Sequence, residues 1–543
     1  MLIVLDNARD SKQVVPLLPG TPSCTVLVTS RDRMAELVTG HSAQPVTVQI
    51  LDEEQARELL SRRLGKQRLA AEPDAVADLL RWCGGLPLAL SIVAGRATLD
   101  PQIPLAELAA ELRDTSSRLS ALDPGGSATS LETVLSWSYR ALAPEQARVF
   151  ALLGLTPGPD ISLPAAANLT GLPQPETLSA LRALEQFSLV QQHASKRYRM
   201  HDLVRLYAKK QAQTDDSDSA LQRLATFACH TAHAADLLIA PSHVTIELDE
   251  LVAGCEPQTL PDDTHAWEWL SAEHTNLMAI QHAALEKHWY PTVWQLAWAM
   301  TTFNLRKGHF HENLAAWQAG LEAAKHLSDP IARTRAYRHL GRAYALLGLH
   351  DQSLPHLQEG LAWAQETHDR LGAAHTHRAV AVAWEQQEKY ELALEHSRRA
   401  LDLYGQLGVA RSGAHALNEV GWYTAKLGDF DQARVLCARA LAQCRGEQDR
   451  SGQATALLSL GYIAHHTDDI DQATRNYQQS LALYQDLGDV AAEASVLDHL
   501  GDATVHADPT AARQAWEHAS DLYQAQGRAD DTRRVQQKIA TLD

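Results

Sequence analysis

The chain has 543 residues, of which 48 are Lys or Arg and 66 are Asp or Glu, so its formal net charge is −18. Hydrophobic residues make up 45% of the chain and charged residues 21%, values close to globular averages that exclude a disordered chain. The acidic balance argues against a whole surface that wraps nucleic acid or an anionic membrane, although a local basic patch stays compatible with it.

The cysteines and the apolar segments indicate a reduced, cytoplasmic protein. The six cysteines are scattered without a CxxC pair, so the sequence indicates neither a disulfide framework nor a zinc ribbon. Residues 1–5 are apolar, but Asp6 ends the run before it has the length of a secretory signal. The longest later apolar stretch, 86–95, falls short of the ~20 residues that span a membrane. We therefore expect no membrane association.

The first 51 residues contain apolar segments that end in polar residues. "LIVLD" (2–6) ends in Asp6, "TVLVTSRDR" (25–33) places Thr29 and Arg31 after a second buried strand, and "VTVQI" (46–50) is a third possible strand. In P-loop NTPases a strand like the first one carries the Walker B carboxylate, which holds the magnesium shell. Any buried parallel strand followed by an acidic turn would match equally well.

Residues 52–125 are expected to form helices. "DEEQARELLSRRLG" opens with Asp52 and further acids in the first turn, which is the usual start of a helix. "CGGLPLAL" (83–90) begins another helix with Gly85 and Pro87. Residues 116–130 contain Pro, two Gly and several Ser, so this segment is interpreted as a linker.

Residues 130–213 combine helices with "FSLVQQHASKRYRMHD" (187–202), which predicts strand, turn and strand and is typical of a winged helix. Residues 193–213 contain six Lys or Arg but one acid, Asp202. A winged helix can place a helix in the major groove of DNA. We favour an internal lever whose charges face nucleotide or solvent, because a fold alone does not establish a function.

The C-terminal half repeats with a period of 40 residues, which indicates a solenoid. A small residue recurs at Gly341, Ala381, Gly421, Gly461 and Gly501, and a leucine follows 20 residues later at Leu361, Leu401, Leu441 and Leu481. A turn position between them holds Gly348, Glu388, Gly428 and Asp468. The pattern predicts pairs of helices that approach closely at the small residue. The last repeat loses one residue in its turn, as expected of a capping repeat.

These columns resemble the tetratricopeptide repeat (TPR) in a variant of about 40 residues. The resemblance covers about six repeats over 301–543, after a helical lead-in at 220–300. It implies an α-solenoid that holds a peptide or protein and carries no chemistry of its own.

The order of the N-terminal motifs, followed by the repeats, resembles the NB-ARC class of STAND nucleotide switches. The segments "VLDNARD", "LLPG", "VLVTSR" and "LPLAL" look most like bacterial NB-ARC–TPR regulators of antibiotic pathways. The resemblance implies a mainly α protein with an incomplete P-loop NTPase remnant (1–51), a helical ARC-type domain (52–125), a winged-helix domain (130–213), the lead-in and the TPR α-solenoid. It also implies a role in signal transduction and transcriptional regulation.

The resemblance implies a nucleotide site made of eight residues, Asp6, Thr29, Arg31, Gly85, Leu86, Pro87, His201 and Asp202. Asp6 would be the Walker B carboxylate, reaching magnesium only through water, and Arg31 would read the terminal phosphate. Pro87 would pack against adenine. His201 would bond the β-phosphate of ADP, with Asp202 supporting its turn. Closure of the domains would then depend on which nucleotide is bound.

Two departures from the family limit this reading. The chain contains no GxxxxGK[ST], and Asn7 follows Asp6 where many relatives carry a second acid. A neutral amide cannot take a proton from attacking water, so we expect no ATP hydrolysis. ADP or ATP with magnesium, the ligands of the full-length family, would bind this chain weakly or not at all.

The start at Met1 suggests a truncated gene product or a misplaced start. Without the P-loop strand, "VTVQI" would be separated from "TVLVTS" and leave an unpaired edge. DNA binding would need an N-terminal domain that this chain lacks. The alternative function is a TPR scaffold with a dead nucleotide site.

The concave face of the array is the expected site for a protein or peptide partner. The candidate residues are Arg335, Arg338, Arg342, Arg378, Trp422 and Tyr462. The groove would run from basic through aromatic to acidic, and we expect an acidic part of the ligand at the arginines and an apolar residue near Trp422. Alternatively, these arginines only solvate a helix face. No histidine motif indicates a metal site, and the oligomeric state stays open.

Overall fold

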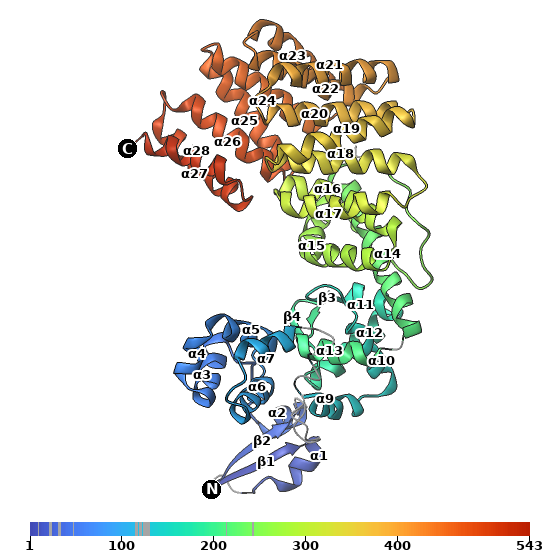
Figure 1. Cartoon of the computed structure of the whole chain (residues 1–543), viewed down its shortest axis with the longest axis vertical. Coiled ribbons are helices and arrows are strands. Elements are labelled where there is room, and N and C mark those ends of the chain that lie inside the picture. The colour runs from blue at the N-terminus through green and yellow to red at the C-terminus, as the bar shows by residue number, and fades with distance from the viewer. Residues whose placement is uncertain are drawn as a thin grey trace. The chain divides into compact units, whose positions relative to one another are not determined.

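The computed structural model describes every residue except 9, 21–23, 31–33, 47, 114–117, 119–121, 123–130, 213, 242–243 and 543 (Figure 1). The chain divides into two compact units, each considered by itself below. Unit 1 comprises residues 1–227 and 251–258, and unit 2 comprises residues 228–250 and 259–543. Among the described helices, none has both the length and the hydrophobicity that crossing a bilayer requires. The division into five segments stays a prediction.

Unit 1 begins with two parallel strands, β1 (Leu2–Ala8) and β2 (Thr25–Ser30). They are connected through α1 (Ser11–Val14) and the short 3-10 helix η1 (Val15–Leu17), and α2 (Ala35–His41) follows β2. One face of the pair packs on a small apolar core that includes Val14 and Leu37, while Leu27 on the opposite face stays exposed. This alternation is what a strand buried on one side produces.

The third strand expected at 46–50 is not formed. In the described part of this segment no residue is in a strand, and the side chains of Val46 and Val48 are 84% and 91% exposed. A strand is stable only when a neighbouring strand accepts and donates its backbone hydrogen bonds, and the two-stranded sheet does not extend to these residues. The chain is instead tied down just beyond, where the Leu51 N–H donates to the Gly85 carbonyl at 3.0 Å.

Five helices follow between residues 53 and 113. They are α3 (Glu53–Leu64), α4 (Lys66–Ala71), α5 (Pro73–Cys83), α6 (Pro87–Leu99) and α7 (Leu105–Arg113). Asp52 caps α3 reciprocally with Gln55, which confirms the predicted start of that helix. Pro87 opens α6, where its missing N–H costs nothing. The linker expected at 116–130 lies outside the described residues apart from residues 118 and 122.

The next segment mixes helices with a small antiparallel sheet. Its elements are α9 (Leu131–Arg140), α10 (Pro144–Leu153), β3 (Ile161–Ser162), α11 (Leu163–Thr170), α12 (Gln174–Gln186), β4 (Gln191–Ala194), β5 (Arg197–Arg199) and α13 (Asp202–Gln211). The strands lie in the order β3–β5–β4. The expected strand–turn–strand is confirmed as β4 and β5, while the winged-helix assignment stays a prediction. Helix α14 (Thr214–Ile239) follows.

Unit 2 is a stack of helices (Figure 1). After α15 (Asp263–Glu286) come α16 (Tyr290–Lys307), α17 (Phe310–Ala324), α18 (Pro330–Leu346), α19 (His350–Glu366), α20 (Arg370–Glu385), α21 (Tyr390–Leu407), α22 (Ala410–Lys426), α23 (Phe430–Gly446), α24 (Arg450–His466), α25 (Ile470–Asp486), α26 (Val490–Thr504), α27 (Pro509–Ala525) and α28 (Ala529–Ala540). Each helix packs on the next one along the chain, as a solenoid requires.

The small residues of the 40-residue period are required by close helix packing. A Cβ atom added at Gly461 would lie 2.6 Å from the ring of Tyr477, and one at Gly501 would lie 2.4 Å from Trp516 Nε1. Gly341 faces Leu357 in the same way, 16 residues further along, as Gly461 faces Tyr477. In the repeats that have glycine in this column, the second helix therefore places a side chain where the first helix has no room for a Cβ.

The turn positions are also explained by the backbone. Gly348, Glu388, Gly428 and Asp468 all have positive φ angles, of 71°, 56°, 93° and 59°. This left-handed conformation ends the first helix of each repeat and favours glycine, while polar residues tolerate it at some cost.

The first helices of the repeats form the inner face of unit 2, which we define by α18, α20, α22, α24 and α26. Direct packing between first helices of successive repeats occurs for α18 with α20, α22 with α24, and α24 with α26. Among the described residues, the second helices of successive repeats contact each other less. A stack bends toward the side where alternate elements touch. Helix α16 also packs against α26, and Arg306 of α16 donates to the Leu487 carbonyl at 3.2 Å. The two ends of the array therefore meet.

Candidate functional site

The parallel pairing of β1 and β2 brings two predicted nucleotide-site residues together. The Thr29 hydroxyl donates a hydrogen bond to the Asp6 carboxylate, and both side chains are exposed. The Ser30 hydroxyl donates to the Ala8 carbonyl at 2.8 Å, which fixes the ends of the two strands together. Arg31, the expected phosphate sensor, lies outside the described residues.

The turn before α6 is built from two glycines with left-handed backbone. Gly84 has φ +58° and Gly85 has φ +73°. A Cβ atom at Gly85 would lie 2.3 Å from the Leu51 carbonyl oxygen, so no other residue fits there. Leu86 is half-buried and Pro87 is exposed at the start of α6. The predicted adenine-side residues thus form one rigid turn.

His201 joins this turn to the start of α13. Its Nε2 lies 2.8 Å from the Gly84 carbonyl oxygen, and its Nδ1 accepts a hydrogen bond from the Leu203 N–H at 3.2 Å. A ring nitrogen that accepts carries no proton, so this pair of contacts selects the neutral tautomer with the proton on Nε2. A Cβ atom at Gly84 would lie 2.7 Å from that Nε2.

The structure therefore assembles the predicted residues in two groups. Asp6 contacts Thr29, and His201 contacts the glycine turn, but no contact between these groups occurs among the described residues. Asp202 is exposed in the first turn of α13, where an acid suits the helix dipole. Sequence reasoning missed Gly84, although the adjacent pair of glycines before a helix-starting proline was a usable signal.

The basic cluster at 193–210 is largely satisfied by its own unit. Arg197 pairs with Asp160 at 2.6 Å, and Lys210 pairs with Glu132 at 2.7 Å. Arg205 donates to the Gly158 and Pro159 carbonyls, and burial lowers the pKa of its guanidinium. These internal contacts favour the lever interpretation over DNA binding.

A small, partly open pocket lies beside β5 and α13, with space for about one water molecule. Thr156, Asp160, Met200 and Arg205 are among its lining residues. It is too small for a nucleotide or any other organic ligand, so it belongs to the packing of unit 1.

The predicted partner residues of the array are mostly engaged with neighbours on the inner face. Arg335 lies over the Trp298 ring at 4.9 Å. Arg378 forms a bidentate ion pair with Glu419, with its shortest contact at 2.6 Å. Burial opposes the charge of Arg378, but the Glu419 carboxylate raises the pKa of the guanidinium above its ordinary value.

The aromatic part of the inner face holds a cation of its own. Trp422 and Tyr462 are in edge contact with ring centroids 4.8 Å apart, and Lys426 Nζ lies 5.0 and 4.6 Å from these two rings. The Trp422 indole N–H donates to Glu385 at 2.6 Å. Trp422 is therefore a hydrogen-bonded member of an aromatic cluster, and its role as an apolar contact for a ligand stays a prediction.

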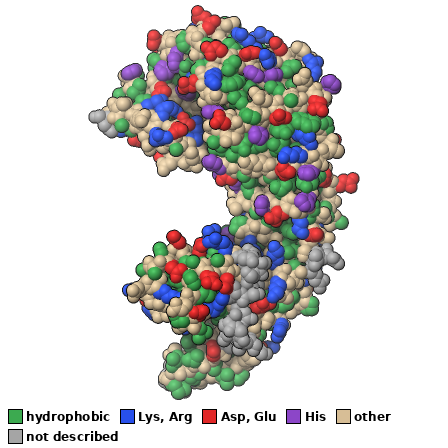
Figure 2. All heavy atoms as spheres, viewed as in Figure 1, with side chains coloured by type: hydrophobic (Ala, Val, Ile, Leu, Met, Phe, Trp, Pro, Cys, Tyr) green, Lys and Arg blue, Asp and Glu red, His purple; other side chains and the backbone are tan. Residues whose placement is uncertain are grey.

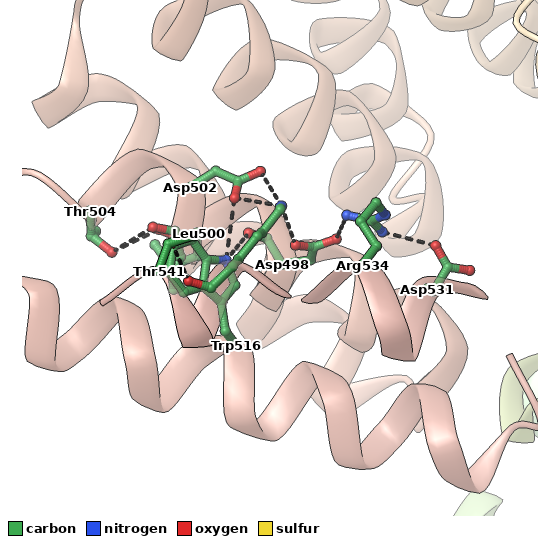
Figure 3. Close-up of polar contacts among 10 residues, drawn as sticks. Asp498, Leu500, Asp502, Thr504, Trp516, Asp531, Arg534 and Thr541 are labelled. Carbon is green, nitrogen blue, oxygen red and sulfur yellow. Dashed lines mark hydrogen bonds and ion pairs between the residues drawn. The ribbon is translucent and has the colours of Figure 1, made fainter. Parts of the chain in front are cut away.

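The acidic end of the inner face is neutralised by the last helix. Lys538 Nζ lies 2.7 Å from Asp498 and 2.6 Å from Asp502, and Arg534 pairs with Asp498 at 2.6 Å. Figure 3 shows Asp498 and Asp502 with Trp516 and Arg534 in one network. Because α28 supplies the countercharges, the groove does not end in free carboxylates as the sequence suggested.

Arg338 and Arg342 differ from their neighbours on the inner face. Arg338 donates to the adjacent His339 at 2.6 Å. For Arg342, no hydrogen bond or ion pair is present within the described part of the chain. The two side chains are one helical turn apart on α18.

Among the described residues, neither a metal-ligand cluster nor a disulfide offers an alternative to the sites above. No cluster of three or more His, Cys, Asp or Glu residues that could hold a metal occurs among the described residues. All six cysteines are free, and burial raises the pKa of Cys83 to about 12, which disfavours the reactive thiolate. Figure 2 shows acidic, basic and histidine side chains interspersed over the visible surface of unit 2.

Comparison with known proteins identifies relatives for nearly the whole chain. Residues 333–406 and 414–486 match the tetratricopeptide repeat. The regulatory protein AfsR of Streptomyces coelicolor is 32% identical over 501 residues, which are 90% of this chain and 45% of that protein. AfsR of Streptomyces griseus is 32% identical over 490 residues, 89% of this chain and 46% of that protein.

A solved STAND-class signal-transduction ATPase with a TPR sensor, from Pyrococcus horikoshii, aligns with 99% of this chain and 81% of its own, at 13% identity and a TM-score of 0.36. The chain spans just under half the length of the AfsR proteins. It is therefore a TPR-containing homologue of the AfsR regulatory proteins, similar to them over about nine tenths of its own length.

Proposed function

We propose that this chain is the switch and receptor part of a regulatory protein of the NB-ARC–TPR kind. Unit 1 supplies the residues that sense a nucleotide, and unit 2 supplies a repeat array that holds a protein or peptide partner. The similarity to AfsR regulators supports a role in transcriptional regulation. DNA binding is assigned to a domain outside this chain, because the basic cluster of unit 1 is used internally.

The contact between His201 and Gly84 carries the proposal. It joins the turn next to the predicted adenine-side residue Pro87 with the first residues of α13. A ligand that replaces the Gly84 carbonyl as the acceptor of the His201 Nε2 proton would move the imidazole. Because His201 caps α13, the position of that helix would change as well. The imidazole would then exchange one oxygen partner for another, and this exchange is the switch.

The residues present fit only part of a nucleotide. Asp6 and Thr29 offer a carboxylate and a hydroxyl at adjacent strand ends, which suit the water shell of a magnesium ion. The backbone cradle and lysine of GxxxxGK[ST], which hold the phosphates, are absent from the sequence. We propose that ADP or ATP with magnesium binds this chain weakly or not at all, and that the chain does not hydrolyse ATP.

Hydrogen exchange of the intact chain with and without millimolar ADP and magnesium tests the switch. We expect protection at residues 83–87 and at the start of α13 in the native chain, and none in His201→Ala. His282→Ala, which changes an exposed histidine on α15, is the matched control. Unchanged exchange in the native chain would support the alternative function.

The alternative function is a TPR scaffold whose nucleotide site is dead. It is favoured by the absence of the phosphate-binding motif. Calorimetry separates the two, because a scaffold binds no ADP at any concentration, whereas the switch binds it weakly. Binding at micromolar or tighter Kd, about −8 kcal/mol or better, would contradict the proposal of weak affinity.

A further inference from the structure

Polar side chains on the inner face of unit 2 pair with one another from repeat to repeat. Arg378 of α20 pairs with Glu419 of α22, and the Asn418 amide donates to the Ser459 hydroxyl of α24 at 3.1 Å. Asp498 of α26 pairs with Lys538 of α28 at 2.7 Å. These contacts form a ladder along the first helices, so most charges on this face are already compensated.

Arg338 and Arg342 interrupt this ladder at α18. The carboxylate of Glu419, which also interacts with Arg342, accepts hydrogen bonds from Nε and Nη2 of Arg378. The described contact of Arg338 is with the imidazole of His339, a neutral acceptor at most. Arg342 makes neither a hydrogen bond nor an ion pair within the described residues. Two cations one turn apart on a helix repel each other, so the empty arrangement is unfavourable.

The surroundings of the two arginines strengthen this repulsion. Burial, together with the charges of Arg335 and Arg342, lowers the pKa of Arg338 to about 10 despite the opposing effect of Tyr404. Burial and Arg378 also lower the pKa of Arg342. The Arg342 side chain is nevertheless exposed to solvent.

One acid from the C-terminal part of the array lies near Arg342. The carboxylate of Asp489, at the start of α26, lies close enough to raise the pKa of Arg342. Asp489 itself is committed to capping α26, where it accepts from the Ala492 N–H at 3.0 Å, and burial raises its pKa. It therefore attracts Arg342 at a distance without satisfying its five N–H donors.

We propose that Arg338 and Arg342 bind one oxyanion group of a protein ligand, a carboxylate or a phosphoryl group, on the inner face of unit 2. Guanidinium groups bind both oxyanions through paired hydrogen bonds, and a partly dehydrated site strengthens these bonds. The inference deepens the proposed role of the array as the receptor for a partner. It narrows the binding surface expected from the sequence to Arg338 and Arg342, two arginines one turn apart on α18 that form no ion pair among the described residues.

Inorganic phosphate is the probe that tests the site in the intact chain. Phosphate is titrated against the native chain, Arg342→Gln and Arg338→Gln at constant ionic strength, and binding is followed by calorimetry. We expect at least a tenfold rise in Kd for each variant, the size of one lost charge-assisted contact. Arg439→Gln on α23 is the matched control, since that exposed arginine lies on a second helix, and it should bind as the native chain does.

Thermal unfolding without phosphate gives a second, independent reading. If the arginines repel each other in the empty site, Arg342→Gln raises Tm; if they only support the helix, it lowers Tm. Competition by acetate against phosphate identifies a carboxylate-type ligand, and lack of competition identifies a phosphoryl-type ligand. Equal phosphate affinity in the native chain, both variants and the control would overturn the proposal. That result would leave the nucleotide experiment on unit 1 unaffected, so the two proposals fail separately.

Discussion

His201 Nε2 lies 2.8 Å from the carbonyl oxygen of Gly84, although 117 residues separate the two in the chain. The left-handed backbone of Gly84 aims this carbonyl at the imidazole, and the missing Cβ leaves room for the ring. The same imidazole caps α13 through Nδ1. One side chain thus ties a helix start to a distant glycine turn, and both contacts depend on its neutral tautomer.

Replacing Gly84 with alanine should break this link. The new Cβ would lie 2.7 Å from His201 Nε2, and the residue would be forced to keep φ near +58°. Together the clash and the strained backbone should cost about 1–3 kcal/mol. Faster hydrogen exchange at the first turn of α13 would show that the imidazole has moved.

Gly95→Ala is the control for that experiment, because nothing lies within 4 Å of a Cβ at this position in α6. An alanine in an open helical position should stabilise the helix by up to about 1 kcal/mol. If both substitutions lowered Tm equally, the contact with His201 would have no special part in the effect of Gly84.

Gly461→Ala should destabilise the array. Its Cβ would lie 2.6 Å from the ring of Tyr477, which is fully buried and cannot move aside. Overpacking of this kind costs about 1–3 kcal/mol. The measurement is the Tm of the intact chain, followed by far-UV circular dichroism.

Gly405→Ala on α21 provides the comparison, since a Cβ there meets nothing within 4 Å. We expect Tm to stay or to rise. A loss of Tm at Gly405 as large as that at Gly461 would mean that the 40-residue column does not mark a packing contact.

Breaking the Arg378–Glu419 pair on one side should cost more than removing it altogether. The side chains are 26% and 18% exposed, so Glu419→Leu leaves a poorly hydrated cation and should cost about 1–3 kcal/mol after allowance for screening. The double variant Arg378→Met with Glu419→Leu should recover part of this loss. A double-mutant cycle based on urea unfolding measures the coupling.

An exposed pair of the same array sets the baseline. Arg450 and Asp486 are 51% and 63% exposed, so Asp486→Asn should change stability by less than about 1 kcal/mol. Coupling between Arg378 and Glu419 no larger than this baseline would show that the inner-face ladder contributes little to stability.

Lowering the pH should weaken the packing of the last helix, α28, on the array. Burial raises the pKa of Asp498, but Lys538 and Arg534 outweigh it and hold the pKa of this carboxyl below its ordinary value. A carboxyl with a lowered folded-state pKa stabilises the fold above its unfolded-state pKa, about 3.9, and this contribution is lost as pH falls through the folded value. Hydrogen exchange in α28 should therefore accelerate below about pH 4.

Lys538→Met should produce part of this release at neutral pH, because it removes the ammonium that Asp498 and Asp502 share. Arg533→Met, at an exposed position on the same helix, should leave α28 protected. Equal protection of α28 in the two variants would show that the docking of this helix does not depend on the network in Figure 3.

The repeat architecture and much of the local structure can be predicted from the amino-acid sequence alone. The small residues and the turn residues recur every 40 residues because the same helix contact and the same backbone conformation recur in successive repeats. The start of α3 at Asp52 and of α6 at Pro87 likewise depends on neighbouring residues alone. Such features can be predicted because the residues that cause them lie close together in the sequence or at a distance fixed by the 40-residue repeat.

Which of the predicted residues are available for binding depends on contacts between distant parts of the chain. The sequence could not show that Lys538 neutralises Asp498 or that Glu385 accepts the hydrogen bond of the Trp422 indole N–H. It also could not show that the described residues of 46–50 lie outside the two-stranded sheet. These outcomes depend on partners 37 to 40 residues away, or on a neighbouring strand, whose identity no local pattern specifies. Arg342 stands out for the same reason, since its lack of an ion-pair partner among the described residues becomes visible only when the neighbouring helices are in place.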